Sequence, residues 1–151
     1  MNILLVDDEP HYLMLLGDYL KNQGWTVHTA ENGEEALEKL KEHPYHIVIS
    51  DIYMPILNGI GLQKAMKEVP AYDLIPFIFV SAYADSSTLA TLDLSDNVKY
   101  LSKSVSPAKL KEWIQYLSRP PHDRGKHPGE ESLSNTETRT LTREPRIPKR
   151  R

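Results

Sequence analysis

The chain has 151 residues, about the length of one domain, and its 18 basic and 21 acidic residues give a formal net charge of −3. Hydrophobic residues make up 40% and charged residues 26%, as in soluble globular proteins, and the lack of cysteine excludes disulfides, cysteine-based zinc sites and a thiol nucleophile. The longest uncharged apolar-rich run covers only residues 74–84, whereas a membrane span needs about 20 residues, so we expect a cytoplasmic protein without a membrane segment.

Strand and helix patterns alternate along the first 117 residues. Short segments containing apolar residues predict strands at 3–6, 25–29, 46–50, 77–80 and 98–101, and the continuous apolar run at 3–6 is of the kind found in strands buried on both faces. Between and after them, apolar residues at helical spacing predict helices at 10–23, 33–43, 60–68, 85–94 and 107–117. Five strands alternating with five helices indicate an α/β fold, a doubly wound parallel sheet covered on both sides.

The last 34 residues differ in composition from the rest. Residues 118–151 contain all seven arginines and carry a net charge of +4, while residues 1–117 carry −7. Only Leu133, Leu141 and Ile147 are apolar in this segment, too few to offset the entropy of ordering it. We therefore predict one acidic folded domain at 1–117 and a basic, proline-containing, flexible tail at 118–151.

Charged and polar side chains follow four of the predicted strands. Asp7 and Asp8 follow the first strand, Asp51 the third, Ser81 the fourth and Lys103 the fifth. Ligands of doubly wound sheets bind at the carboxyl ends of the strands, so we expect these side chains to lie together. Crowded carboxylates favour a bound cation, and hard oxygen ligands suit Mg²⁺. An aspartate beside Mg²⁺ and an ammonium can accept a phosphoryl group.

These residues resemble those of a known family. The segments are Asp7-Asp8-Glu9, Asp51-x-x-Met54-Pro55-x-x-x-Gly59, Ser81-Ala82 and Tyr100-Leu101-x-Lys103. In this order and spacing they resemble the receiver domain of two-component response regulators, which has a flavodoxin-like fold with strand order 2-1-3-4-5. The chain departs from the family pattern where Ser104 replaces the usual proline after the lysine and where Ser95-Asp96 replaces the usual Gly-Ala before the fifth strand.

The resemblance implies a role for each matching residue. Asp51 is the phospho-acceptor; Asp7, Asp8, Asp51 and the backbone carbonyl of Tyr53 hold Mg²⁺ or Mn²⁺. Ser81, Ala82 and Lys103 bind the phosphoryl group, and Ser81 and Tyr100 form the switch pair. Tyr53 and Tyr83, each two residues beyond a site residue, flank the path of the hydrolytic water.

The resemblance also implies a signalling role. A sensor histidine kinase or histidine phosphotransfer protein donates the phosphoryl group. An output protein binds the face made by the fourth helix, fifth strand and fifth helix, and a homodimer is a further possible partnership. The receiver assists its own phosphorylation and dephosphorylation but is not a conventional turnover enzyme.

Two other functions stay open from the sequence. One is a pseudo-receiver, an interaction module that works without phosphorylation; the retained Asp51, Ser81 and Lys103 count against it. The other is a fragment of a DNA-binding regulator that uses the basic tail. No helix-turn-helix pattern follows residue 117 and the tail has no aromatic residue for stacking on bases, so we do not expect a nucleic acid partner. For Asp85 and Asp96, a cap or turn role is the better hypothesis.

Overall fold

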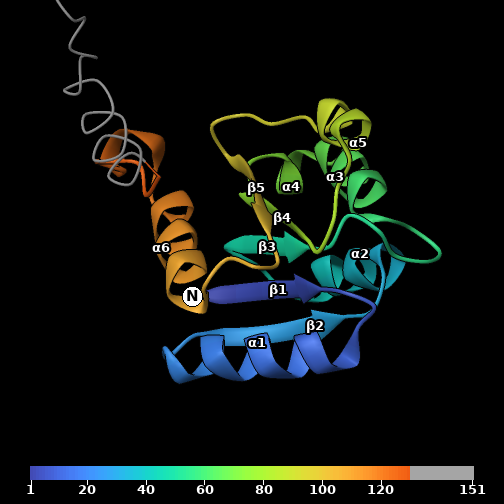
Figure 1. Cartoon of the computed structure of the whole chain (residues 1–151), viewed down its shortest axis with the longest axis horizontal. Coiled ribbons are helices and arrows are strands. Elements are labelled where there is room, and N and C mark those ends of the chain that lie inside the picture. The colour runs from blue at the N-terminus through green and yellow to red at the C-terminus, as the bar shows by residue number, and fades with distance from the viewer. Residues whose placement is uncertain (130–151) are drawn as a thin grey trace, which may run out of the picture.

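The computed structural model describes residues 1–129, which form a single parallel sheet with helices on both faces (Figure 1). The sheet order is β2-β1-β3-β4-β5, and all four neighbouring pairs are parallel. The strands are β1 (Asn2–Val6), β2 (Thr26–Ala30), β3 (Ile47–Ser50), β4 (Phe77–Ser81) and β5 (Val98–Ser102). The predicted α/β class and the strand order 2-1-3-4-5 are confirmed.

Six α-helices and one short 3-10 helix lie in the described part of the chain. They are α1 (Pro10–Asn22), α2 (Gly33–Glu42), α3 (Gly59–Lys67), α4 (Pro70–Asp73), α5 (Ser86–Thr91), α6 (Pro107–Ser118) and η1 (Pro121–Asp123). The sequence predicted five helices, and α4 is the additional one. Its four residues are too few to show a helical repeat, so the apolar pattern did not reveal it. The predicted fourth and fifth helices are therefore α5 and α6.

Short polar side chains cap four of the helices. Asn32, Asn58, Asp85 and Ser106 each accept a hydrogen bond from the backbone N–H three residues later, at 2.7–3.1 Å. These bonds satisfy amide groups that have no partner inside the helix. The capping role expected for Asp85 is confirmed. The helix that it caps, α5, is shorter than the predicted 85–94, because the backbone turns to an extended conformation at Leu92.

The sheet divides the hydrophobic core into two layers. Alternate strand side chains, such as Ile3 and Leu5, face α1 and α6 in one layer. Their neighbours Leu4 and Val6 face the other layer, which α2 and α3 cover. All four side chains are at most 1% exposed, as expected for an inner strand of a parallel sheet. In the register of β1 with β3, Val6 pairs with Ser50, so the two strands end side by side.

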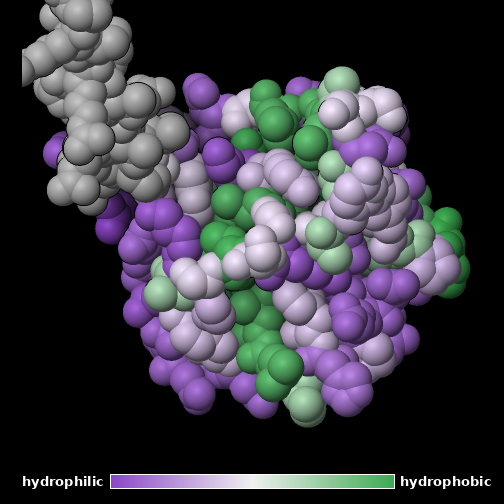
Figure 2. All heavy atoms as spheres, in the orientation of Figure 1, coloured by the Kyte–Doolittle hydropathy of each residue, from purple (hydrophilic) through white to green (hydrophobic). Residues whose placement is uncertain are grey.

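Some large apolar side chains remain at the surface of the described residues. Figure 2 shows one face of the molecule, where hydrophobic residues occur in separate patches among hydrophilic ones. The exposed large hydrophobic side chains among the described residues are Met14, Leu15, Tyr53, Ile56, Val69, Leu74, Tyr83 and Leu94. Within residues 1–129, no helix combines the length and apolar character that crossing a membrane requires.

The first part of the predicted tail is packed on the domain. Arg124 is only 6% exposed, and the ring of His127 lies 4.2 Å, centroid to centroid, from the ring of Trp113. For residues 118–129 this arrangement differs from the expected flexible segment. The difference arises because a guanidinium can be buried when it donates several hydrogen bonds, even where few of the residues near it in the sequence are apolar. The domain boundary at residue 117 stays a prediction, and the rest of the predicted tail, residues 130–151, lies outside the described residues.

Candidate functional site at the carboxyl ends of the strands

Backbone hydrogen bonds bring the ends of the strands together. The Asp51 N–H donates to the carbonyl of Val6 at 2.9 Å, which places Asp51 beside the end of β1. The Lys103 N–H donates to the carbonyl of Ser81 at 2.9 Å, which continues the pairing of β5 with β4. The predicted site residues on these strands therefore meet at one edge of the sheet.

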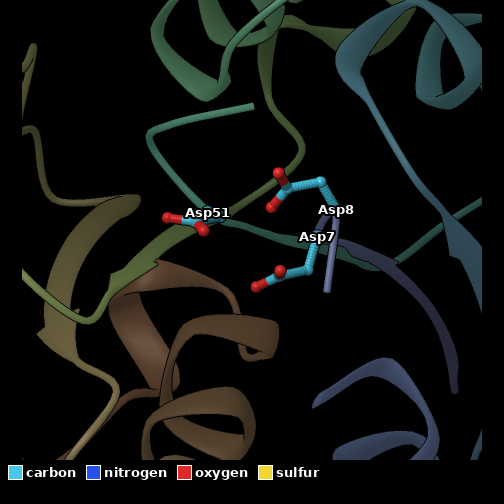
Figure 3. A group of neighbouring side chains, drawn as sticks. All are labelled: Asp7, Asp8 and Asp51. Atoms are coloured by element: carbon cyan, nitrogen blue, oxygen red, sulfur yellow. The ribbon is translucent and has the colours of Figure 1, made fainter. Parts of the chain in front are cut away.

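Three carboxylates lie close together at this edge. Asp7 and Asp8 extend from the end of β1 and Asp51 from the end of β3, as Figure 3 shows, and one oxygen of each lies within 4.8 Å of the others. Asp7 is 1% exposed and Asp51 8% exposed, while Asp8 is exposed. Negative groups at such distances repel one another unless a cation is near.

The ammonium of Lys103 is one such cation. Its Nζ lies 2.8 Å from Oδ2 of Asp7, 3.3 Å from Oδ2 of Asp51 and 3.5 Å from Oε2 of Glu9. The lysine side chain is only 13% exposed, so water screens these pairs poorly. Lys103 therefore joins β5 to the ends of β1 and β3.

Burial and ion pairing shift the acid–base properties of the site in definite directions. Burial raises the pKa of Asp7, and the hydrogen bonds from Lys103 and from the Glu9 N–H offset only part of this effect. Burial alone would lower the pKa of Lys103, but the hydrogen bonds and charges of Asp7 and Asp51 outweigh it and raise the pKa. Lys103 is therefore a permanent cation at neutral pH.

The two oxygens of Asp51 have different surroundings. Oδ1 accepts a hydrogen bond from the Ile52 N–H at 2.7 Å and a longer one from the Tyr53 N–H at 3.4 Å. Oδ2 lies on the Lys103 side, at 3.3 Å from Nζ. The backbone thus holds one oxygen in place, and the other faces the ammonium.

The donor set is suited to a hard divalent cation. Asp7, Asp8 and Asp51 supply carboxylate oxygens, the ligands that Mg²⁺ and Mn²⁺ prefer, and the exposed Asp8 leaves one side open to water. Tyr53 lies two residues after Asp51, in the loop after β3. Its predicted role as a carbonyl ligand stays a prediction.

The other predicted phosphoryl-binding and switch residues are Ser81 at the end of β4, Ala82 in the loop after it and Tyr100 on β5. The Ser81 hydroxyl is buried and donates a hydrogen bond to the carbonyl of Tyr83 at 3.0 Å, within its own loop. Ala82 is exposed in that loop, and Tyr100 is half-buried against the core layer of Leu4 and Val6. The phosphoryl-binding role of Ser81 and Ala82 and the pairing of Ser81 with Tyr100 stay predictions.

The two tyrosines predicted to guard the water path differ in exposure. Tyr83 is 74% exposed, and Tyr53 is 46% exposed. The Tyr53 hydroxyl donates to Oγ1 of Thr88 on α5 at 3.1 Å. Tyr53 thus bridges the loop after β3 and α5, and the shielding of the site by either ring stays a prediction.

Sequence reasoning missed a contact made by Tyr12. The Nζ of Lys103 lies 4.5 Å from the centre of the Tyr12 ring, a distance typical of a cation–π interaction. Burial raises the pKa of this tyrosine to about 12. In the sequence, Tyr12 is one of several apolar residues at helical spacing in α1, so the pattern identified its packing but not its cationic neighbour.

The structure also explains why a glycine stands at position 59. A Cβ atom there would collide with the carbonyl oxygen of Asp51, and it would lie 3.1 Å from Oγ of Ser50. The Gly59 N–H donates to the carbonyl of Ile52 at 2.9 Å. The start of α3 can therefore approach the backbone of Asp51 only because position 59 has no side chain.

Serine side chains close the loop that follows Lys103. The hydroxyl oxygens of Ser102 and Ser104 lie 2.9 Å apart, and the Ser104 N–H donates to Oγ of Ser102 at 3.2 Å. The Val105 N–H donates to the carbonyl of Ser102 at 3.0 Å. The family resemblance led us to expect proline at position 104. In this chain, hydrogen bonds hold the loop at Ser104 instead.

Comparisons with known proteins agree with the fold. An uncharacterised 14.6 kDa protein of Leptolyngbya boryana is 34% identical over 123 residues, which cover 80% of this chain and 94% of that protein. The transcriptional regulatory protein CssR of Bacillus subtilis is 38% identical over 117 residues, which cover 76% of this chain but only 50% of CssR. The chain thus matches one relative over nearly its full length and the other over about half.

A solved structure matches the fold. The receiver domain of the sensor histidine kinase PA1611 of Pseudomonas aeruginosa superimposes with a TM-score of 0.70 at 22% identity, covering 78% of this chain and 96% of that domain. That structure has a magnesium ion coordinated in its active-site cleft. The family model of the response regulator receiver domain matches residues 3–115. The chain belongs to the response regulator receiver domain family.

Proposed function

We propose that this chain is a phosphoacceptor receiver in a two-component phosphorelay, and that Asp51 takes the phosphoryl group. The observation that carries the proposal is the position of Asp51 Oδ2, 3.3 Å from the Lys103 ammonium and beside two further carboxylates. A receiver needs this combination because the incoming group is anionic and its acceptor is also anionic. A pseudo-receiver works without phosphorylation and does not need this combination of an ammonium and carboxylates.

In the transfer step, an O–P bond to Asp51 replaces the N–P bond of the donor. An oxygen of Asp51 forms a bond to the phosphorus of a phosphohistidine on the donor, and the N–P bond breaks in line with the attack. The electron pair of the broken bond stays on the imidazole nitrogen of the donor. The hydrogen bonds from Ile52 and Tyr53 hold Oδ1, so Oδ2 is the oxygen available for attack.

A divalent cation, Mg²⁺ or Mn²⁺, belongs to this proposal. Asp7, Asp8 and Asp51 would hold it, together with the backbone carbonyl of Tyr53. When bound, the cation offsets the negative charge that the carboxylates and the phosphoryl group bring together. The donor set described above supports this assignment, and the magnesium in the PA1611 receiver domain agrees with it.

Phosphorylation would change the contacts of Lys103 and Ser81. The Lys103 ammonium now contacts Asp51 and Asp7, and it would contact an oxygen of the phosphoryl group after the transfer. The Ser81 hydroxyl would give up the Tyr83 carbonyl to donate to another phosphoryl oxygen, with Ala82 supplying the adjacent backbone. Tyr100 would then move toward the space that Ser81 leaves. The phosphoryl group selects among states that are already accessible.

The face made by α5, β5 and α6 would transmit the signal by binding a partner. Receiver domains are signalling modules that interact with histidine kinases and phosphotransfer proteins. We propose that such a protein phosphorylates this chain in the cytoplasm and that the α5–β5–α6 face binds an output protein or a second copy of the chain. In this role the chain assists its own phosphorylation and dephosphorylation but does not turn over a substrate.

Intact-mass spectrometry after incubation with acetyl phosphate and Mg²⁺ tests the proposal. We expect the wild-type chain to gain the mass of one phosphoryl group and Asp51→Ala to gain none. Chelating the metal with EDTA should abolish the gain. Asp18→Ala, a change at an exposed residue of α1, is the matched control and should be labelled like the wild type. Equal labelling of Asp51→Ala and wild type would overturn the assignment.

A further inference from the structure

The segment that follows α6 is attached to the domain through one buried arginine. Arg124 is 6% exposed although it lies among exposed residues. Its guanidinium donates to the Asp96 carbonyl at 2.7 Å, to the Arg119 carbonyl at 3.0 Å, to the Leu117 carbonyl at 3.2 Å and to Oδ1 of Asn97. A buried guanidinium requires such partners, because an unsatisfied donor away from water is costly. The four acceptors thus define a specific site for this side chain.

The segment has further contacts beyond Arg124. The ring of His127 lies 4.2 Å from that of Trp113 and 5.4 Å from that of Tyr116, both on α6. The Lys109 ammonium donates to the carbonyl of Pro128 at 2.6 Å. The chain after α6 therefore turns back along the same helix to Trp113, and the Lys109 side chain extends from the first turn to meet it. In Figure 1 the segment lies directly beside the end of α6.

The acceptors of Arg124 connect two parts of the domain. Leu117 belongs to the last turn of α6 and Arg119 follows that helix directly, whereas Asp96 and Asn97 lie in the loop between α5 and β5, immediately before β5. Lys103, at the opposite end of β5, is paired with the carboxylate site. β5 is thus held at its start by Arg124 and at its end by Lys103.

A cavity of about 480 Å³ lies between the segment, α6 and the start of β5. The residues that line it include Asp96, Lys99, Trp113, Tyr116, Arg124 and His127. The Lys99 ammonium lies 4.5 Å from the centre of the Trp113 ring, so the stem of the lysine and the indole extend along the same surface. The segment covers part of this aromatic surface of α6.

We propose that residues 119–129 form an intramolecular clasp, held by Arg124, that masks the β5 and α6 side of the α5–β5–α6 face. The clasp is an autoinhibitory contact: a partner that binds the Trp113 and Tyr116 surface must first displace it. While the clasp is docked, it also restrains the loop between α5 and β5. The inference goes beyond the proposed function, because docking of the clasp requires no phosphoryl group.

Amide hydrogen exchange on the full chain tests the docking of the clasp. In the wild type, the amides of residues 120–129 should exchange at least tenfold more slowly than amides of an unstructured chain. Arg124→Gln should raise the exchange rate at least tenfold both there and at residues 95–98. Lys126→Gln removes the same charge from an exposed position of the clasp and should leave both regions unchanged. Unprotected amides at 120–129 in the wild type, or unchanged exchange in Arg124→Gln, would overturn the proposal.

Binding of an apolar dye tests the masking. Release of the clasp should expose Trp113 and Tyr116, so Arg124→Gln should bind anilinonaphthalene sulfonate several-fold more strongly than the wild type or Lys126→Gln. Arg124→Lys keeps the charge but loses the planar fork, and it should give an intermediate result even if Arg124→Gln does not fold. If hydrogen exchange shows that the clasp is released, but Arg124→Gln and Arg124→Lys bind the dye no more strongly than the wild type, the segment masks no surface. Asp51→Ala should show the same amide protection and the same dye binding as the wild type. Failure of phosphorylation and failure of clasp docking are therefore distinguishable.

Discussion

The hydroxyl of Tyr53 lies 3.1 Å from Oγ1 of Thr88 and donates a hydrogen bond to it. This bond connects the loop that follows Asp51 to α5, a helix of only six residues. Short helices depend on tertiary contacts because they gain little from their own hydrogen bonds. The contact therefore stabilises α5 and holds the Tyr53 side chain against that helix.

The position of Tyr53 leads to a prediction about the lifetime of phosphorylated Asp51. A ring over the phosphoryl group would exclude the water that must approach in line with the P–O bond. We expect Tyr53→Asn and Tyr83→Glu to lose the phosphoryl group several-fold faster than the wild type, and the double variant faster still. The measurement is the decay of the phosphorylated mass after the donor is removed.

A matched variant separates shielding from the hydrogen bond to Thr88. Tyr53→Phe keeps the ring and loses only the hydroxyl, so its decay rate should stay near that of the wild type. Faster decay of Tyr53→Phe, equal to that of Tyr53→Asn, would mean that the bond to α5 controls the lifetime. Unchanged decay in every variant would show that neither ring guards the site.

The carboxylate cluster predicts stabilisation by Mg²⁺. A cation that binds only the folded chain raises the free energy of unfolding, by about 2.7 kcal/mol at a concentration 100-fold above its dissociation constant. We expect saturating Mg²⁺ to raise the urea midpoint of the wild type. Asp8→Ala should remove most of this increase, whereas Asp18→Ala should keep it. A full Mg²⁺ effect in Asp8→Ala would contradict the assigned ligand set.

Two glycines give a matched pair for stability. Gly59→Ala places a Cβ against the Asp51 carbonyl, and crowding of this kind typically costs about 1–3 kcal/mol. A Cβ at Gly17, in α1, would meet no atom within 4 Å, so Gly17→Ala should be neutral or stabilise the helix by up to about 1 kcal/mol. Urea unfolding measures both changes. Equal stability of the two variants would contradict the close approach of α3 to Asp51.

A histidine on β2 predicts a pH dependence of stability. Nδ1 of His28 lies 2.7 Å from the hydroxyl of Tyr45, and the His28 ring lies 4.7 Å from that of His43. Burial, followed by the charge of His43, lowers the pKa of His28 from its usual 6.5. The unfolded chain therefore binds more protons than the folded chain as the pH falls below about 6.5, so acid favours unfolding.

The expected result is a difference between variants. From pH 7.5 to pH 5.5 the urea midpoint of the wild type should fall, and His28→Gln should fall by less because the titrating ring is absent. His11→Gln, at an exposed position of α1, should behave like the wild type. If His28→Gln loses as much stability as the wild type over this range, His28 is not the source of the acid sensitivity.

The sequence alone determined the presence of the parallel sheet and the position of the acidic cluster. The strand order followed from the family resemblance. Buried parallel strands appear as continuous apolar runs, and a residue that directly follows such a run must lie at the edge of the sheet. Asp7, Asp51 and Lys103 were therefore predictable from local pattern. The capping role of Asp85 was predictable for the same reason, since a cap and its partner are only three residues apart.

Only the tertiary structure decided the contacts between residues far apart in the chain. Arg124 finds its carbonyl partner Asp96 28 positions away, and Tyr12 and Lys103 meet although they belong to α1 and the end of β5. No local pattern marks such partners, because a polar side chain is buried only where the assembled fold supplies matching donors and acceptors. The sequence therefore determined where the charged residues of the sheet edge lie, and packing decided which of them touch and why an arginine of the basic tail is buried.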